Sequence, residues 1–153
     1  MTSDPENLSA LGLENYVPYL MNRIMGRYNS ALSTEISALG LSTPKLRALA
    51  VLSVQDDLLI RELAVYAVIE QSTLSRALDG LEQDGLVQRA PDKSDGRAFR
   101  VKLTQAGHDA HARLWPHMMQ ASEAMFTGIS KAEREALTVT LQKMLRNIRK
   151  HDF

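Results

Sequence analysis

The sequence predicts a mainly α-helical chain that carries one small β-hairpin. Over most of its 153 residues, apolar side chains recur every three or four positions, the spacing that gives a helix one apolar face. Residues 86–103 change to two short extended runs, and the loop between these runs contains Pro91, Asp92 and Gly96, which are typical of a hairpin connection. A chain of this length builds one ordinary core, so we expect one domain.

The first long helix is expected over residues 13–32. Its apolar stripe consists of Leu13, Val17, Leu20, Ile24, Tyr28, Ala31 and Leu32. After it, Ser42-Thr43-Pro44 places a hydroxyl cap before a proline at the first helical position, where the missing N–H costs nothing. We therefore expect a short second helix that continues through Leu52.

A strand and a third helix follow. Asp56 and Asp57 end the second helix, residues 58–60 form a short strand or an extended entry, and residues 61–66 form a compact helix. A tight corner comes next and contains Val68. We expect this corner to avoid a left-handed backbone there, because a β-branched side chain tolerates that conformation poorly.

The fourth helix is predicted over residues 71–84 and has two distinct faces. The apolar face carries Leu74, Ala77, Leu78 and Leu81, and the polar face carries Gln71, Thr73, Ser75, Arg76 and Asp79. Gly85 stands where a left-handed residue ends a helix. Glu70 is a poor cap, so the start of this helix is the least defined of its features.

The hairpin is predicted to pair residues 86–89 with residues 99–103. The second strand alternates strictly, with Phe99, Val101 and Leu103 turned inward and Arg100 and Lys102 turned outward. The loop between the strands is rich in charge and too long for a minimal turn. A hairpin with a basic tip is the result.

Two helices are predicted in the last third of the chain. Thr104 caps the first of them, and Pro116 predicts a kink or a break near residues 112–115. Residues 130–133 read Ser-Lys-Ala-Glu, a capping box that opens the last helix. That helix has a stripe of Leu137, Leu141, Leu145 and Ile148.

Composition excludes several function classes. The absence of cysteine excludes disulfides, thiolate zinc sites and thiol nucleophiles. No apolar run reaches the roughly 18 residues of a membrane span and no secretory signal opens the chain, so we expect a cytoplasmic protein that binds no membrane. No phosphate-binding glycine loop or serine elbow is present, so we expect neither an enzyme nor a cofactor.

Charge is balanced overall but not locally. Lysine plus arginine equal aspartate plus glutamate at 18 each, for a net charge of +0. Between Leu86 and Thr104, five basic residues stand against two acidic ones: Arg89, Lys93, Arg97, Arg100 and Lys102 against Asp92 and Asp95. A short helix, a corner, a helix with a polar face and then a basic hairpin predict a winged helix-turn-helix that binds duplex DNA.

Residues 43–110 resemble the MarR family of bacterial transcriptional regulators. The resemblance rests on residues 61–64 (RELA), 71–87 (QSTLSRALDGLEQDGLV), 92–98 (DKSDGRA) and 103–107 (LTQAG). It implies a homodimer that binds a palindromic operator through two winged domains, often as a repressor released by a small ligand. Within one intertwined domain it assigns residues 1–42 and 105–153 to dimerisation and residues 43–104 to DNA binding.

The resemblance also assigns roles to single residues. It places Gln71, Ser72, Thr73, Ser75 and Arg76 at the major groove. It places Arg97 at the minor groove, held by Asp95, with Lys93 and Arg100 on phosphates. For Ser72 and Thr73 the alternative is a purely local role in starting the helix, and for Lys93, Arg100 and Lys102 it is an ordinary solvated charge.

Dimer and effector sites are predicted less directly. The striped terminal helices lack an intramolecular partner, so we expect them to bury each other across a twofold axis. Tyr16, Tyr19, Arg23, Arg27 and Tyr28 could line a pocket for an aromatic or phenolic ligand, or could simply be core and interface.

Two other readings of the chain stay open. His108 and His111 are three residues apart and would suit a metal-responsive regulator, although no third ligand is evident and we expect no metal site. The neutral charge and Glu70 would suit a winged-helix protein-interaction module that does not bind DNA.

Overall fold

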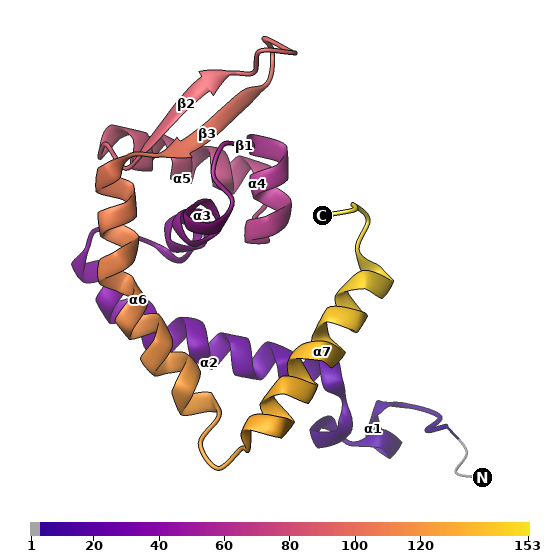
Figure 1. Cartoon of the computed structure of the whole chain (residues 1–153). Coiled ribbons are helices and arrows are strands. Elements are labelled where there is room, and N and C mark those ends of the chain that lie inside the picture. Colours follow the sequence, from indigo (N-terminus) through magenta and orange to yellow (C-terminus); the bar gives the residue numbers. More distant parts are fainter. Residues whose placement is uncertain (1–3) are drawn as a thin grey trace.

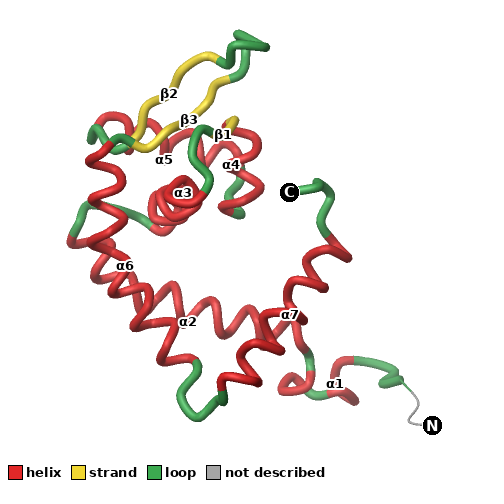
Figure 2. Tube along the Cα trace, in the orientation of Figure 1, coloured by secondary structure: helices red, strands yellow, loops and turns green. Residues whose placement is uncertain are grey.

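The computed structural model describes residues 4–153 and contains three strands among its helices (Figures 1 and 2). The elements are α1 (Leu8–Leu11), the 3-10 turn η1 (Leu13–Asn15), α2 (Val17–Ala38), α3 (Thr43–Val54), β1 (Leu58–Leu59), α4 (Ile60–Ala67), α5 (Gln71–Gln83), β2 (Val87–Pro91), β3 (Phe99–Leu103), α6 (Gln105–Met125) and α7 (Lys131–Ile148). Helices α3 to α5 and the strands form one lobe, and α2 packs against α6 below it. Helix α7 runs separately and has no buried residue. No helix in residues 4–153 is long and apolar enough to cross a membrane.

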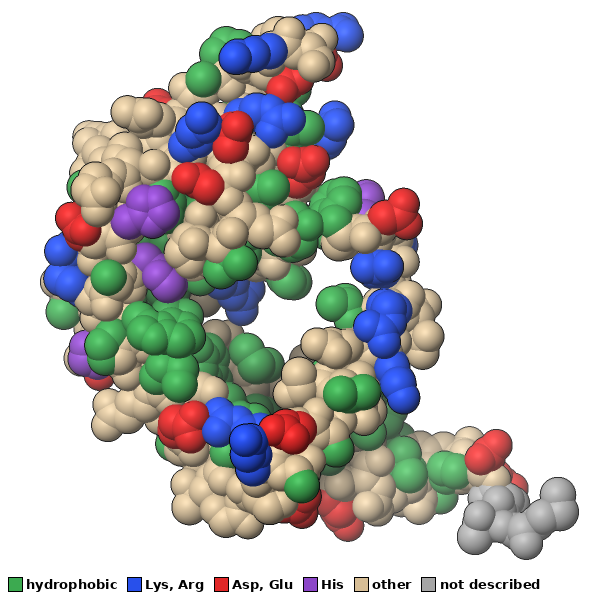
Figure 3. Space-filling model, in the orientation of Figure 1, with side chains coloured by type: hydrophobic (Ala, Val, Ile, Leu, Met, Phe, Trp, Pro, Cys, Tyr) green, Lys and Arg blue, Asp and Glu red, His purple; other side chains and the backbone are tan. Residues whose placement is uncertain are grey.

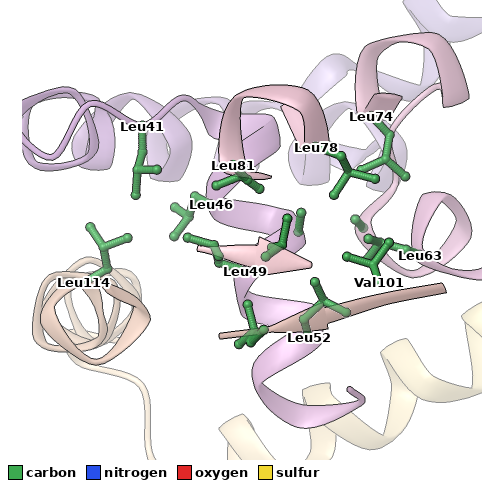
Figure 4. Close-up of a cluster of buried hydrophobic side chains, with 14 of the residues drawn as sticks. Leu41, Leu46, Leu49, Leu52, Leu63, Leu74, Leu78, Leu81, Val101 and Leu114 are labelled. Atoms are coloured by element: carbon green, nitrogen blue, oxygen red, sulfur yellow. The ribbon is translucent and has the colours of Figure 1, made fainter. Parts of the chain in front are cut away.

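The core of the lobe contains leucines from α3, α4 and α5 and two valines of the sheet, Val87 and Val101. Figure 4 shows Leu49 and Leu52 of α3 facing Leu63 of α4 and Leu78 of α5, with Val101 of β3 among them. All five side chains are fully buried. Their burial holds α5 with its apolar face inward, as its helical spacing predicted, and so turns its other face to solvent.

The sheet has the order β1-β3-β2, and both pairings are antiparallel. The predicted strand at residues 58–60 is confirmed for two residues, while Ile60 already belongs to α4. The prediction that Phe99 turns inward is wrong, because this side chain is 44% exposed. It pairs with Pro91 at the outer end of β3, where the hairpin extends beyond the core.

The N-terminal region differs from the predicted long helix. Helix α2 begins at Val17 rather than Leu13, with Pro18 in its first turn, where proline is tolerated, and α1 and η1 precede it. Ser42 is the N-cap residue of α3, but its hydroxyl accepts no capping hydrogen bond.

Of the kink or break predicted near Pro116, the break is wrong, because α6 continues through the proline to Met125. A proline at this position removes the N–H that would bond to the carbonyl of Ala112. Both residues are exposed, so water can reach that side of the helix. On the other side Leu114 is fully buried, and its packing opposes a break.

The prediction for the corner at Val68 is also wrong. Val68 has φ 55° and ψ 53° and is the left-handed cap of α4. The Ile69 N–H donates to the Ala64 carbonyl at 3.1 Å, which closes the turn, and the Arg47 guanidinium donates to the Val68 carbonyl at 3.3 Å. The side chain is 78% exposed. The geometry of the turn therefore outweighs a local cost of about 1–2 kcal/mol.

The join between the hairpin and α6 is tightly built. Thr104 accepts a hydrogen bond from the Gly107 N–H at 3.0 Å, which confirms it as the cap of α6, and its hydroxyl donates to the Gly85 carbonyl. Its own N–H donates to the Leu86 carbonyl at 3.0 Å. A Cβ on the buried Gly107 would lie 2.1 Å from that carbonyl oxygen, so this position requires glycine. Gly85 has the predicted positive φ, at 74°.

Candidate nucleic-acid interface

Helix α5 presents its polar residues to solvent. Gln71, Ser72, Ser75 and Arg76 are exposed, and Thr73 is half-buried. These five residues, predicted as groove contacts, therefore lie on one helix with an accessible face. A helix with such a face has the width to enter a DNA major groove.

The start of α5 lacks the usual cap. Glu70 is the N-cap residue and its carboxylate makes no capping bond to the backbone. Instead it accepts a hydrogen bond from the Ser72 hydroxyl at 3.1 Å. Ser72 therefore bonds to the side chain of the N-cap residue rather than capping the backbone of α5, and its own side chain stays exposed.

The tip of the hairpin is organised by two aspartates. Asp92 accepts hydrogen bonds from the N–H groups of Ser94 and Asp95, at 3.2 and 3.1 Å. Asp95 accepts one from the Arg97 N–H at 3.1 Å, and the Arg97 guanidinium lies 3.5 Å away from the same carboxylate. The side chain of Arg97 is 95% exposed. The expected Asp95–Arg97 pair thus exists, and it leaves the guanidinium free for a further partner.

Arg100 makes internal contacts that sequence reasoning did not foresee. Its guanidinium donates to Asp92 at 2.6 Å and to the Asp57 carbonyl at 2.7 Å, which ties β3 to the loop before β1. The hydrogen bond with Asp92 raises the pKa of Arg100 and lowers the pKa of that carboxyl. Arg100 can reach a phosphate only by sharing or giving up these partners, whereas Lys93 at the tip is exposed.

Arg89 is a second basic residue whose role was missed. It bonds to Glu82 at 3.2 Å and to Asp79 at 2.7 Å, so it joins β2 to the outer face of α5. Side-chain hydrogen bonds to both acids raise the pKa of Arg89, and the bond from Arg89 lowers the pKa of Glu82. The signal was present in the sequence: two acids three residues apart on one helix, followed by an arginine on the adjacent strand.

A groove lies between the hairpin and the beginnings of α4 and α5. Its volume is about 350 Å³, and its walls include Gln71, Ser75, Arg97 and Phe99. Arg61, in the first turn of α4, also lines it and was not among the predicted contacts. Figure 3 shows basic and acidic side chains mixed on this lobe, which fits the neutral total charge. The arrangement suits a polyanion held by a few localised cations.

A second cavity of about 460 Å³ lies between α2 and α6. Three of the five residues predicted for a ligand pocket line it: Arg23, Arg27 and Tyr28. Burial raises the pKa of Tyr28. Tyr19 is adjacent, since its hydroxyl accepts a hydrogen bond from Arg23 at 3.3 Å, but Tyr16 caps α2 and does not line the cavity.

His108 and His111 of α6 belong to no cluster of potential metal ligands among the described residues. Within residues 4–153, no group of three or more potential ligands is found. Burial lowers the pKa of His111, whose Nε2 atom is buried without a hydrogen-bond partner, and its ring lies 6.3 Å from that of Trp115.

Comparisons with known proteins agree on one family. A family model described as MarR family matches residues 39–98. The crystal structure of a MarR family transcriptional regulator from Silicibacter pomeroyi is 57% identical, spans 97% of this chain and 100% of its own, and has a TM-score of 0.91. The HTH-type transcriptional repressor IacR of Pseudomonas putida is 26% identical over 135 residues, which are 88% of this chain and 81% of IacR.

A third relative is described together with its effector. The structure of Bordetella bronchiseptica BpsR, from work on the regulation of its DNA binding by 6-hydroxynicotinic acid, is 25% identical. It spans 84% of this chain and 97% of its own, with a TM-score of 0.74. These relatives are regulators of transcription and not enzymes.

Proposed function

The chain belongs to the MarR family of transcriptional regulators, and from this premise we propose that it is a repressor that binds a palindromic operator as a homodimer. The observation that carries the proposal is the groove in which residues of α5 and the hairpin meet. Ser75 of α5 and the exposed Arg97 of the hairpin line this same groove. One duplex can therefore take α5 in its major groove and the hairpin in the adjacent minor groove.

Each DNA contact has a proposed role. Arg76, on the exposed face of α5, reads a guanine edge or holds a phosphate, and Gln71, Ser72, Thr73 and Ser75 complete the groove contacts. Arg97 enters the minor groove while Asp95 orients it, and Lys93 binds phosphate. Arg100 also contacts phosphate in this proposal, although its bonds to Asp92 and Asp57 give it an anchoring role as well.

The dimer is proposed from apolar surface that the single chain leaves uncovered. Leu141, Leu145 and Ile148 of α7 are 40%, 61% and 78% exposed, and Leu20 and Ile24 of α2 are 38% and 49% exposed. A second copy would bury these stripes around a twofold axis. Residues 1–42 and 105–153 would then dimerise, and residues 43–104 would carry DNA binding; residues 1–3 lie outside the described chain. Light scattering that gave a monomer at micromolar concentration would contradict this part.

An effector site is proposed in the cavity between α2 and α6. The guanidinium groups of Arg23 and Arg27 would bind a carboxylate, and the phenol ring of Tyr28 would stack on an aromatic acid or phenol. Such a ligand would release DNA by binding more tightly to the conformation that does not bind DNA, by about 1–3 kcal/mol in a typical coupling. Aromatic carboxylates titrated against the protein–DNA complex test this, and an unchanged DNA affinity across the panel would contradict it.

Selection of bound DNA from a random pool tests the main proposal. We expect an inverted repeat whose half-sites are about 10 base pairs apart, one helical turn. Arg76→Ala should relax the selected sequence at one position of each half-site, and Arg97→Ala should weaken binding by about 1–3 kcal/mol. A protein-interaction module would select no sequence, and its partner binding would depend little on salt.

A further inference from the structure

Residues 149–153, called the tail here, return from the end of α7 to the DNA-binding lobe. Figure 1 shows the end of the chain directed toward α4. The ring of Phe153 lies 5.2 Å from that of Tyr66 on α4, and His151 stacks on Phe153 at 5.2 Å. Aromatic contacts therefore hold the tail against α4.

The tail lies beside the groove already described. His151 and Phe153 line a hollow of about 360 Å³ together with Arg61 and Gln71. These last two residues also line the groove next to the hairpin. The two hollows share one rim, so the surface offered to a duplex continues from the hairpin, past the start of α5, to the tail.

The first two residues of the tail are basic and form no ion pair with a carboxylate of the described chain. Arg149 and Lys150 are exposed, and within residues 4–153 neither lies within 4.0 Å of a carboxylate. Figure 3 shows basic side chains along this part of the chain. Favourable interaction with the helix dipole accounts for a cation in the last turn of α7, such as Arg146. Arg149 is the C-cap residue of α7, where the same dipole also favours a cation, whereas Lys150 follows the end of the helix.

We propose that the tail is an additional DNA contact, in which Arg149 and Lys150 bind backbone phosphates next to the half-site while Phe153 holds the tail on Tyr66. This inference rests on the proposed DNA binding. The tail would be an interaction surface outside α5 and the hairpin. Phosphate contacts contribute affinity and salt dependence but no sequence preference.

The test compares three double variants and Phe153→Ala, all in the full chain, on the duplex that the parent selects, with Kd measured over a series of salt concentrations. Arg149→Gln with Lys150→Gln removes two charges from the tail. Lys131→Gln with Lys143→Gln removes two charges elsewhere on α7 and is the matched control. Arg149→Lys with Lys150→Arg keeps both charges.

We expect the tail double variant to bind about 5- to 50-fold more weakly and its slope of log K against log salt to fall by about 0.9 for each phosphate that the tail no longer neutralises. The control and the charge-keeping variant should match the parent in both quantities. Phe153→Ala should weaken binding about 2- to 5-fold at unchanged charge, because the tail is then no longer held near the duplex.

Each contrary outcome has its own meaning. A parent that selects no duplex overturns the proposed function itself. A parent that binds, with a tail double variant of equal slope and affinity, overturns this inference alone. An equal weakening of the tail double variant and the control would show a general charge effect and also overturn it. An unchanged Kd for Phe153→Ala would overturn the role of the aromatic contact.

Discussion

Replacing Gly107 by alanine tests how the hairpin is fixed to α6. The added Cβ would lie 2.1 Å from the Leu86 carbonyl oxygen, where real contacts stay above about 3.0 Å, so α6 must shift by roughly 1 Å. That oxygen also accepts the Thr104 N–H at 3.0 Å. Overpacking costs about 1–3 kcal/mol, and losing the hydrogen bond to the half-buried Leu86 costs about 0.5–1.5 kcal/mol more. We therefore expect the free energy of unfolding to fall by about 1.5–4.5 kcal/mol.

Urea unfolding followed by circular dichroism measures this effect at a fixed protein concentration, because dimerisation would contribute to stability. Gly80→Ala in α5 is the matched control. Its Cβ would meet only the end of the Lys45 side chain, at 2.7 Å from Nζ, and that side chain can move away. We expect the control to be neutral or slightly stabilising. If Gly107→Ala unfolded at the same urea concentration as the control, the reasoning would be refuted.

Three further outcomes are expected. Val68→Gly should raise the free energy of unfolding by about 0.5–1 kcal/mol, because glycine removes the strain of a left-handed valine, although it also increases the backbone entropy of the unfolded chain. A lower urea midpoint for the variant would contradict the left-handed turn at Val68. Arg89→Met should weaken DNA binding by about 0.5–2 kcal/mol in fluorescence anisotropy because it frees the hairpin from α5, and an unchanged Kd would rule out this positioning role. Burial lowers the pKa of His111, so the imidazole binds a proton more readily in the unfolded chain, and the free energy of unfolding should decrease as the pH falls below about 6.5. His111→Gln should make this decrease smaller. Parallel curves of stability against pH for the parent and the variant, from pH 7 to 5, would contradict this role of His111.

The parts of the fold predicted correctly depend on local sequence. The apolar spacing around Leu74 and Leu78 fixes the inward face of α5, the Ser130–Glu133 capping box opens α7 with bonds in both directions, and Gly85 has its left-handed turn. Each of these features needs only residues within one or two helical turns.

The incorrect predictions concern positions whose conformation or role depends on contacts with residues distant in the sequence. The burial of Leu114 is consistent with α6 staying intact at Pro116, and the closure of the α4–α5 turn imposes a left-handed Val68. Within the candidate site, Arg100 is bonded to Asp57, 43 residues away in the sequence. Spacing along the chain identified a basic hairpin but could not separate the cations that hold it together from those left free.

The central claim is that α5 and the hairpin meet one duplex, and directed cleavage of DNA tests it most directly. The chain contains no cysteine, so a single cysteine at Ser75, Ser94 or Ser37 can carry an iron–EDTA group. All three positions are exposed, on α5, the hairpin loop and α2 respectively. The account predicts cleavage of the selected operator from positions 75 and 94 within the same half-site and little from position 37. Equal cleavage from position 37, or none from the other two, would contradict it.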